Sequence, residues 1–273
     1  MAADLVRLWE GAGHEVRVWT ERATWLDAGP LRRLLGHLWN DRVPMAKCAE
    51  IVDWQPDAVI THNLTGCGWS TGKHIRARLN IPWVHVLHDV QLFEPSGWLW
   101  QDRVSWWQRF WSWYRKGLVG APTLVVSPSQ WLLEAHRRRG VFLGTSAQVI
   151  PNPAPTHSLE GSPSREGWVF VANQLSEANG VDMVYALADA LREERFVLIG
   201  SAQHIKKLDA SNAVHLGSCS REEVLQQVRK ARGLLVPSRI CENQPTTILE
   251  ALSLGTPVIG TAAAGIPEAM EGG

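Results

Sequence analysis

Two carboxylates, Glu242 and Glu250, stand eight positions apart in the segment CENQPTTILEALSLGTPVIG, residues 241–260. On one continuous helix they would lie about 80° apart around the axis and about 12 Å apart along it, too far to share a proton. Because proline is tolerated in a helix only in its first turn, we expect the helix to begin near Pro245 and to leave Glu242 in the preceding loop. Glu250 then lies on the second turn, and Gly255 ends the helix.

This helix is predicted to connect two buried parallel strands. The runs GLLVPS (233–238) and TPVIGT (256–261) are short, apolar and bounded by turn residues. In such units ligands bind at the carboxyl ends of the strands, and a helix N-terminus offers unpaired N–H groups to an anion. A ligand with a phosphate at its centre would find these donors there and a carboxylate towards each of its ends. The segment therefore predicts the binding of a nucleotide sugar.

The composition argues against several other classes of protein. The 273 residues include 27 basic and 27 acidic side chains, so no overall charge favours nucleic acid as a partner. No apolar run approaches 18 residues, and the N-terminus lacks the basic start and apolar core of a signal peptide. The four cysteines form no C-x-x-C pair, which is typical of reduced thiols. We therefore expect a cytoplasmic protein.

Apolar runs alternate with amphipathic segments along most of the chain, which predicts an α/β protein with parallel sheets covered by helices. The expected strands are 15–20, 57–62, 83–88, 123–127, 147–151, 168–173, 195–200 and 212–217, together with the two runs around the Glu242 segment. The expected helices are 1–11, 42–53, 69–79, 98–116, 129–139, 181–193 and 221–231, together with the one near Pro245.

The chain is predicted to form two Rossmann-like domains. The segment PNPAPTHSLEGSPSREG, residues 151–167, has the composition of a linker, and the alternation restarts after it. We therefore expect an N-terminal domain over 1–152, a linker over 153–166 and a C-terminal domain over 167–273. A cleft between two such domains is the default place for a ligand.

Several motifs together resemble those of the retaining glycosyltransferases of sequence family four, which have the GT-B fold. They are THNLTG, IPWVHVLHDVQLFEP, VVSPSQWLLEAHRRRG, VIPNP, NGVD and ENQPTTILEALSLGTPVIGTAAAGIPE. The resemblance covers nearly the whole chain. It implies a hexosyltransferase-like enzyme with an N-terminal acceptor domain and a C-terminal nucleotide-sugar domain, acting in polysaccharide or cell-envelope synthesis on a saccharide or lipid-linked acceptor.

The resemblance also implies roles for individual residues. Glu250 would receive the ribose hydroxyls, Glu242 and His88 would act at the transferred sugar, and the backbone of Asn243, Gln244, Pro245 and Thr246 would approach the sugar or the diphosphate. Transfer would occur on the front face, with the leaving diphosphate helping to take the acceptor's proton. The sequence contains no Asp-x-Asp, so a metal-held diphosphate is not indicated, and no cofactor is expected beyond the nucleotide sugar, whose base stays open.

The chain departs from the family pattern at the diphosphate and at both ends. Members usually carry an Arg after the first strand of the C-terminal domain and a Lys before the next helix, and Asn173 and Asn179 stand at or near these positions. Loss of one such donor can cost about a hundredfold in rate. The chain also starts within what resembles the first helix and stops before the last strands, so the resemblance implies a C-terminal domain that is incomplete.

Further residues have two interpretations each. His62, Asn63 and Asp89 stand at predicted strand ends, where they contact the acceptor or, for Asp89, orient His88. Ser238 and Arg239 stand beside the donor site, where Arg239 either replaces a lost cation or is solvated. In the predicted helix 98–116 the aromatic and basic residues either lie in a membrane interface or pack on their own domain; they are Trp100, Trp107, Trp111, Tyr114, Arg103, Arg109, Arg115 and Lys116.

Two rival functions stay open at this point. The first is a non-catalytic remnant of a glycosyltransferase that still binds a nucleotide or sugar, favoured by Asn173 and Asn179; hydrolysis of the donor without acceptor separates it from an enzyme. The second is sugar-nucleotide epimerisation on the same fold, which product analysis without acceptor would reveal. The sequence names neither the base, the sugar nor the acceptor.

Overall fold

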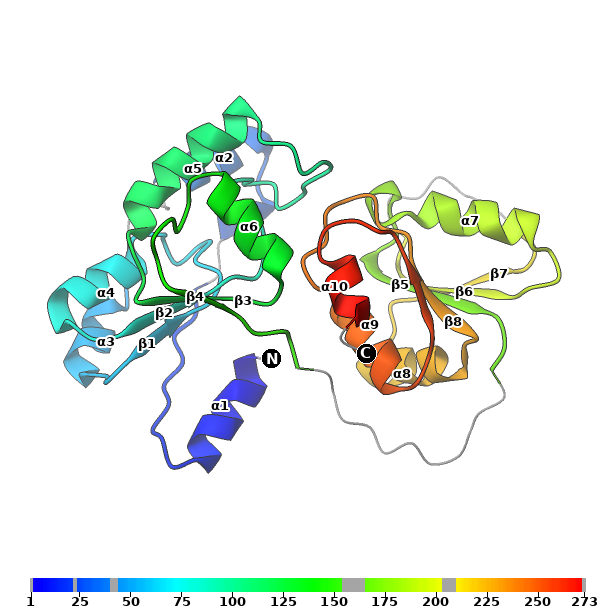
Figure 1. Cartoon of the computed structure of the whole chain (residues 1–273), viewed down its shortest axis with the longest axis horizontal. Coiled ribbons are helices and arrows are strands. Elements are labelled where there is room, and N and C mark those ends of the chain that lie inside the picture. The colour runs from blue at the N-terminus through cyan, green and yellow to red at the C-terminus, as the bar shows by residue number, and fades with distance from the viewer. Residues whose placement is uncertain (1, 22–23, 40–43, 154–164, 203–209, 272–273) are drawn as a thin grey trace. The chain divides into compact units, whose positions relative to one another are not determined.

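The computed structural model describes residues 2–21, 24–39, 44–153, 165–202 and 210–271. Two compact units form (Figure 1): Met1–Trp98 with Arg103–Ile150, and Leu99–Asp102 with Pro151–Gly273. Most of the predicted linker, residues 154–164, lies outside the described residues. Each unit contains a parallel sheet covered by helices, so the predicted fold class is confirmed.

The first unit is built on a four-stranded parallel sheet in the order β1-β2-β3-β4. Its strands are β1 (Val59–Thr61), β2 (Trp83–Val86), β3 (Leu124–Ser127) and β4 (Ala147–Val149). All four were predicted as strands. Since they run parallel, with Thr61 opposite His85, the residues that follow β1 and β2 meet at one edge of the sheet.

Helices cover this sheet in the first unit. They are α1 (Ala2–Gly11), the 3-10 turn η1 (Thr24–Asp27), α2 (Pro30–Trp39), α3 (Cys48–Trp54), α4 (Thr71–Leu79), α5 (Trp106–Val119) and α6 (Gln130–Arg138). Met45, Cys48, Ile51 and Ile75 pack together between α3 and α4 as one core cluster. Helix α2 was not among the predicted helices, although leucines at 31, 34, 35 and 38 follow the helical period.

The strand predicted over 15–20 is wrong. The backbone there joins no sheet, and Val18 is 62% exposed. Instead, Glu15 accepts a hydrogen bond of 3.3 Å from Trp54 Nε1, and the Arg17 guanidinium lies over the Trp54 ring. Alternation of apolar and polar residues indicates an extended backbone, but it does not supply a neighbouring strand.

The helix predicted over 98–116 begins later than expected. Ser105 caps α5 by accepting a hydrogen bond from Gln108 N, so Trp100 and Arg103 lie before the helix. Trp111 and Arg115 are fully buried, which confirms the packing interpretation for these two residues. The aromatic side chains that α5 exposes are Trp106, Trp107, Phe110 and Trp113.

The second unit is built on a five-stranded parallel sheet in the order β7-β6-β5-β8-β9. Its strands are β5 (Trp168–Gln174), β6 (Phe196–Ser201), β7 (Ala213–Gly217), β8 (Gly233–Val236) and β9 (Val258–Gly260). Its helices are the 3-10 turn η2 (Glu177–Asn179), α7 (Val181–Ala190), α8 (Arg221–Lys230), α9 (Thr246–Ser253) and α10 (Ile266–Glu271). All five strands and the three longer helices were predicted.

Both faces of this sheet are buried, as Figure 1 shows with α7 on one side and α8 and α9 on the other. In β5, Phe170 packs with α7 residues such as Val184, whereas its neighbour Val169 packs with Val228 of α8 and Ala251 of α9. Strands buried on both faces read as continuous apolar runs, which is why the sequence pattern identified them.

Helix α9 has the predicted ends. Pro245 occupies its N-cap position, and Glu242 lies in the loop before it. At the other end Gly255 adopts a left-handed conformation with φ of 67°. The N–H of Gly255 donates to Leu252 O and that of Thr256 to Ala251 O, which satisfies the last carbonyls of the helix.

Candidate functional site

The loop from Ser238 to Pro245 links β8 to α9 and carries most of the predicted donor residues. Several hydrogen bonds hold its backbone. Arg239 N donates to Ala178 O at 2.9 Å, Cys241 N donates to Leu99 O at 2.7 Å, and Gly265 N donates to Glu242 O at 2.8 Å. The loop is therefore fixed in front of the N-terminus of α9 rather than free to adapt.

Glu242 is a partly buried carboxylate in this loop. Ser238 Oγ donates a hydrogen bond of 3.2 Å to Glu242 Oε1. Burial raises the pKa of the Glu242 carboxyl, and the bond from Ser238 acts in the opposite direction. A carboxylate of this kind is an acceptor with lone pairs to spare, and a sugar hydroxyl can donate to it.

Glu250 lies on the second turn of α9, as predicted, and has a partner that the sequence did not indicate. Arg221, the first residue of α8, forms an ion pair with Glu250 over 3.1 Å. The side chain of Glu250 is 15% exposed and that of Arg221 is 67% exposed. Because an ion pair with an exposed arginine contributes at most about 1 kcal/mol to stability, a diol can displace Arg221 from the Glu250 carboxylate.

Gln244 fixes the chain at the start of the second unit instead of facing solvent. It is buried, and its Oε1 accepts a hydrogen bond of 2.6 Å from the backbone N of Asn152. Asn243, Pro245 and Thr246 complete the loop and open α9. The backbone N–H groups of the first turn of α9 supply the donors that an anion needs.

Asn173 and Asn179 lie at the carboxyl end of β5, beside this loop in the sheet order. Asn173 is exposed. Asn179 Nδ2 donates to Gln174 O at 2.8 Å and to Ser176 Oγ at 3.2 Å, so it holds the turn before α7. Neither residue brings a positive charge to a phosphate.

Arg239 is exposed, as the interpretation of it as solvated implies, and it also pairs with an acid. Its Nη2 forms an ion pair with Asp182 Oδ2 on the first turn of α7. The charge of Arg239 is thereby partly neutralised at the strand end, and Ser238 beside it bonds Glu242.

In the first unit, the predicted sugar and acceptor residues come together after β1 and β2. His62 Nδ1 and His88 Nε2 are 2.7 Å apart and share one hydrogen bond. Burial lowers the pKa of both imidazoles, that of His88 to about 4. Both rings are therefore neutral at pH 7, and a neutral imidazole has one nitrogen that donates and one that accepts.

Asn63 and Asp89 form a second contact between the same two strand ends. Asn63 Nδ2 donates to Asp89 Oδ2 at 2.7 Å, and Gln91 N donates to Asp89 Oδ1 at 2.8 Å. The Gln91 side chain accepts from Thr65 Oγ1 at 2.5 Å. Gln91 and Thr65 stand within two of the quoted motifs but were not among the predicted site residues, because the sequence does not show that the two loops are in contact.

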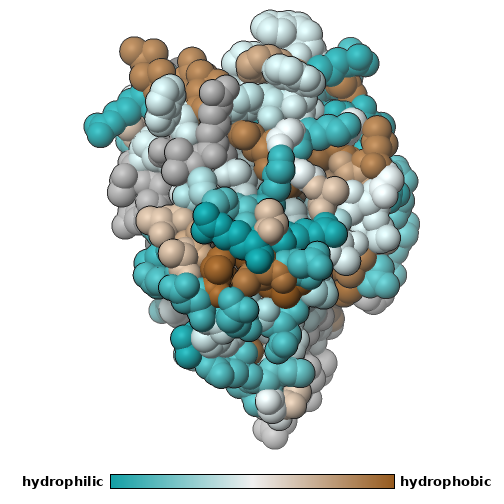
Figure 2. All heavy atoms as spheres, turned by 90° about the vertical axis from the view of Figure 1, so that its left-hand side faces the viewer, coloured by the Kyte–Doolittle hydropathy of each residue, from teal (hydrophilic) through white to brown (hydrophobic). Residues whose placement is uncertain are grey.

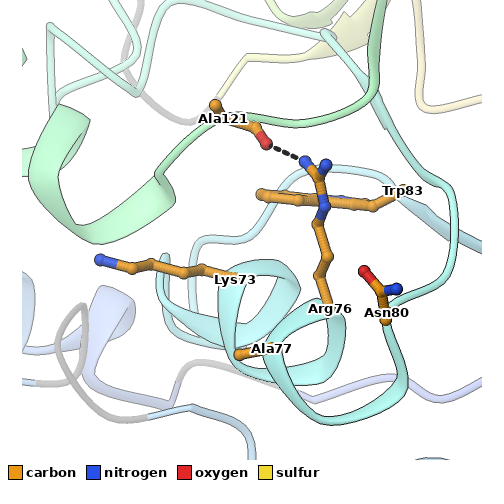
Figure 3. Close-up of a pocket in the computed structure, with 6 residues that line it drawn as sticks. All are labelled: Lys73, Arg76, Ala77, Asn80, Trp83 and Ala121. Atoms are coloured by element: carbon orange, nitrogen blue, oxygen red, sulfur yellow. Dashed lines mark hydrogen bonds between the residues drawn. The ribbon is translucent and has the colours of Figure 1, made fainter.

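A shallow depression of about 430 Å3 lies elsewhere in the first unit, at the amino end of β2. Figure 3 shows Arg76 bonded to the Ala121 carbonyl beside Trp83, with Lys73 pointing away. Since Trp83 begins β2 and His88 follows the end of that strand, the depression and the histidine pair lie at opposite ends of the strand.

The sequence profile of Glycosyltransferase Family 4 matches residues 1–158, and that of Glycosyl transferases group 1 matches residues 165–273. The chain belongs to Glycosyltransferase Family 4. The family confirms the predicted resemblance, and this family member transfers a sugar from a nucleotide-sugar donor. No curated protein matches the chain in a sequence search.

Solved structures confirm the GT-B fold of this Family 4 member. It is similar to Anabaena Alr3699/HepE in complex with UDP and glucose, with a TM-score of 0.65 and 19% identity over 97% of this chain and 72% of the other. It is also similar to sucrose-phosphate synthase from Thermosynechococcus elongatus, with a TM-score of 0.61 and 17% identity over 88% of this chain and 65% of the other.

Proposed function

We propose that this glycosyltransferase moves a hexose from a UDP-sugar to a hydroxyl of a saccharide or lipid-linked acceptor, with retention of the anomeric configuration. The observation that carries the proposal is the fixed loop with the Glu242 carboxylate directly before the N-terminus of α9. The HepE structures in complex with UDP and with UDP-glucose support uridine as the base.

The roles in the donor unit are those that the resemblance implies, and the contacts of each side chain are compatible with them. Glu250 accepts two hydrogen bonds from the ribose diol after releasing Arg221. Glu242 accepts from a hydroxyl of the transferred sugar, and the N–H groups at the start of α9, from Thr246 on, stabilise the charge on the diphosphate. This arrangement needs no metal ion, because backbone dipoles face the leaving group.

His88 and its neighbours act on the sugar and the acceptor. The neutral His88 ring hydrogen-bonds a hydroxyl of the transferred sugar, while His62, Asn63 and Asp89 offer polar atoms to acceptor hydroxyls. As the bond from the anomeric carbon to the diphosphate breaks, the bond to the acceptor oxygen forms on the same face. The acceptor's proton passes to the departing phosphate oxygen, so no protein side chain has to act as a strong base.

The rival without catalysis has one observation in its favour. Asn173 and Asn179 are neutral, and Arg239 is paired with Asp182, so none of these three described residues replaces the cations that normally clamp a diphosphate. Hydrolysis of UDP-glucose without acceptor separates the two functions. A chain that binds UDP tightly and never cleaves the donor is a binding remnant, and formation of an epimeric sugar nucleotide would reveal an epimerase.

The first experiment is a thermal-shift screen of the full chain against UDP, GDP, ADP and their common sugars. A ligand at 100 times its dissociation constant adds about 2.7 kcal/mol to the free energy of unfolding. We expect a clear shift with UDP and UDP-sugars that is absent in Glu250→Ala. No shift with any nucleotide in a folded protein contradicts the proposed donor site.

We further propose that α2 and α5 contact a membrane surface, which suits a lipid-linked acceptor and extends the predicted segment 98–116. The two helices meet where Tyr114 Oη donates to Leu38 O at 2.5 Å. Trp39, Trp106 and Trp113 are each at least 74% exposed, and leucines 31, 34 and 35 of α2 are exposed beside them. Figure 2 shows hydrophobic side chains at the surface among hydrophilic ones on this side of the molecule.

Charge makes an anionic bilayer the best partner for this α2–α5 face. The two helices contain no Asp or Glu, and their exposed charges are Arg32, Arg33, Arg109 and Lys116. Exposed tryptophan with basic residues is typical of interfacial helices. No described helix is long and apolar enough to cross a membrane, so the contact would be peripheral.

Co-sedimentation with vesicles tests this contact. We expect binding to phosphatidylglycerol vesicles, weaker binding to phosphatidylcholine, and loss of binding in the Trp106→Ser/Trp113→Ser variant. The matched control, Leu191→Ser/Leu216→Ser, removes two exposed apolar side chains from the second unit and should bind like the parent. Equal binding of the tryptophan variant and the parent would show that the face has another purpose.

A further inference from the structure

A guanidinium is buried completely in the first unit. Arg115 of α5 has no exposed surface, and its cation lies 4.7 Å from the centre of the Trp111 ring and 5.4 Å from that of the Trp69 ring. Taking a guanidinium out of water costs several kcal/mol unless its N–H groups find acceptors and its charge finds compensation. The two aromatic faces supply part of that compensation.

The polar contacts of Arg115 point to two segments far from it in sequence. Nη2 donates to His37 Nδ1 of α2 over 2.9 Å, and Nη1 donates to the backbone carbonyl of Gln91. Burial and, next, the charge of Arg115 lower the pKa of His37 to about 4. His37 is therefore a neutral acceptor, and the contact with the Gln91 carbonyl brings the guanidinium against the loop that contains Gln91.

Gln91 connects this buried cation to the cluster at the strand ends. Its backbone N donates to Asp89 Oδ1 at 2.8 Å, and its Oε1 accepts from Thr65 Oγ1 at 2.5 Å and from Asn63 Nδ2 at 3.4 Å. Asp89 in turn accepts from Asn63. One residue thus joins α5 to the loops after both β1 and β2.

We propose that Arg115 is a positioning residue for glycosyl transfer: it holds Gln91, and through Gln91 it fixes Asp89 and the adjacent His88 at the end of β2. This inference rests on the proposed function of the His88 cluster. The last backbone bond to β3 comes from Leu87, whose N–H donates to Val126 O at 2.8 Å; residues 88 to 91 are irregular, so strand hydrogen bonds do not define the backbone there. A buried planar guanidinium with two fixed acceptors defines it instead.

The electrostatic contacts agree with this role. Burial raises the pKa of the Asp89 carboxyl, whereas the hydrogen bond from Gln91 N and the positive charge of Arg115 lower it. Removal of the cation would therefore weaken the carboxylate as an acceptor at the same time as it frees the loop. Both effects act on the residues that receive sugar hydroxyls in the proposed mechanism.

The test compares Arg115→Met with Val119→Ala. Methionine keeps much of the volume of Arg115 without its donors, and Val119 lies one turn further along α5, is fully buried and contributes apolar packing. Each protein is assayed for kcat and KM with UDP-glucose, for UDP binding, and by NMR for the ring nitrogens of His62 and His88. Arg115→Lys is a second variant in case the methionine variant fails to fold.

We expect Arg115→Met to lower kcat by about a hundredfold, the effect of a displacement of about 1 Å, and to shift the ring signals of the histidine pair. UDP binding should stay unchanged, because its residues lie in the other unit. Val119→Ala should leave kcat within about threefold and the ring signals in place, and Arg115→Lys should recover part of kcat.

Other outcomes would overturn the inference. They are a loss of kcat no larger than that of Val119→Ala, a loss of kcat without movement of the ring signals, or a movement of the signals without loss of kcat. If the parent chain turns over no donor, the proposed function fails by itself. The ring signals of Arg115→Met, or of Arg115→Lys, then decide alone whether the clamp on the loop exists.

Discussion

Gly265→Ala tests whether the donor loop must keep its position. Gly265 stands between β9 and α10, and its N–H donates to Glu242 O at 2.8 Å. A Cβ atom on Gly265 would lie 1.4 Å from Asn243 O and 2.5 Å from Asn243 C. The φ angle of Gly265 is not in the left-handed region, so alanine can adopt the backbone conformation of Gly265. The close contact with Asn243 is therefore what opposes the substitution.

The size of the effect follows from this overlap. Because real Cβ contacts are essentially never closer than 3.0 Å, the methyl group and the Asn243 carbonyl must separate by about 1.6 Å. Both atoms belong to backbone or its direct substituent, so no side chain can rotate away. Overpacking of this kind costs about 1–3 kcal/mol of stability, and a misplacement of about 1 Å in a site costs about a hundredfold in rate.

The assay is donor hydrolysis and transfer, beside UDP-induced thermal stabilisation. The matched control is Gly260→Ala, whose Cβ would meet the side chains of Ile266, at 2.8 Å from Cγ2, and Met270, at 3.3 Å from Sδ, an overlap much smaller than that of Gly265 with the Asn243 backbone. We expect Gly265→Ala to fold, to lose turnover by about a hundredfold or more and to lose part of the UDP shift, while Gly260→Ala keeps both. Parent-like turnover in folded Gly265→Ala would falsify the idea that the loop acts through its fixed position.

Four further predictions concern single residues and pH. Glu250→Ala should abolish the stabilisation by UDP, measured by thermal shift, and an unchanged shift would place the ribose elsewhere. Glu242→Ala should lower kcat more than UDP affinity, measured by hydrolysis kinetics and calorimetry; equal losses would contradict a contact to the sugar. Asn179→Lys should raise turnover at least about tenfold by restoring a cation near the diphosphate, and no gain would argue against that location. Burial lowers the pKa of His85 to about 3 and that of His136 to about 4, so each is neutral in the folded protein over a pH range in which the unfolded chain binds a proton. The free energy of unfolding, measured with urea, should therefore fall by about 2 kcal/mol per histidine between pH 7 and pH 5 and continue to fall towards pH 4. A flat pH profile would contradict the burial of neutral rings.

Much of the fold could be predicted because both sheets are parallel and buried. Apart from Arg195, the run at 195–200 is apolar, and it became strand β6. Pro245 and Gly255 defined α9, since each residue has a conformational preference that only a helix end satisfies. The sequence was sufficient wherever the residues of one short segment determine whether that segment is a strand, a helix or a helix end.

Prediction failed where the outcome depends on distant partners. The segment 15–20 has the pattern of a strand, but its residue Glu15 hydrogen-bonds Trp54 of α3 and its backbone pairs with no strand. The aromatic residues of helix α5 spread over nearly half of its circumference, so periodicity could not say which rings face inward. The structure buries Trp111 and Arg115 and exposes Trp113.

The candidate site shows the same division. The order of strand, loop and helix placed Glu242 and Glu250 correctly on their elements. The ion pairs of Glu250 with Arg221 and of Arg239 with Asp182 join residues 29 and 57 positions apart. The close approach of Gly265 to Asn243 was likewise hidden, because a glycine without positive φ carries no local signal.

The charges of the donor unit separate nucleotide binding from turnover. Arg239 is held by Asp182, and the amide of Asn179 holds a turn, so neither neutralises a diphosphate without rearrangement. Arg221 is exposed, and its ion pair with Glu250 contributes at most about 1 kcal/mol to stability. Ribose hydroxyls can therefore replace Arg221 on Glu250 at little cost. In the proposed mechanism, binding of the nucleoside therefore uses groups that are already in place. Departure of the diphosphate would depend instead on the N–H groups of α9, whose orientation the loop and Gly265 maintain, so we expect a slow enzyme that binds its nucleotide with ordinary affinity.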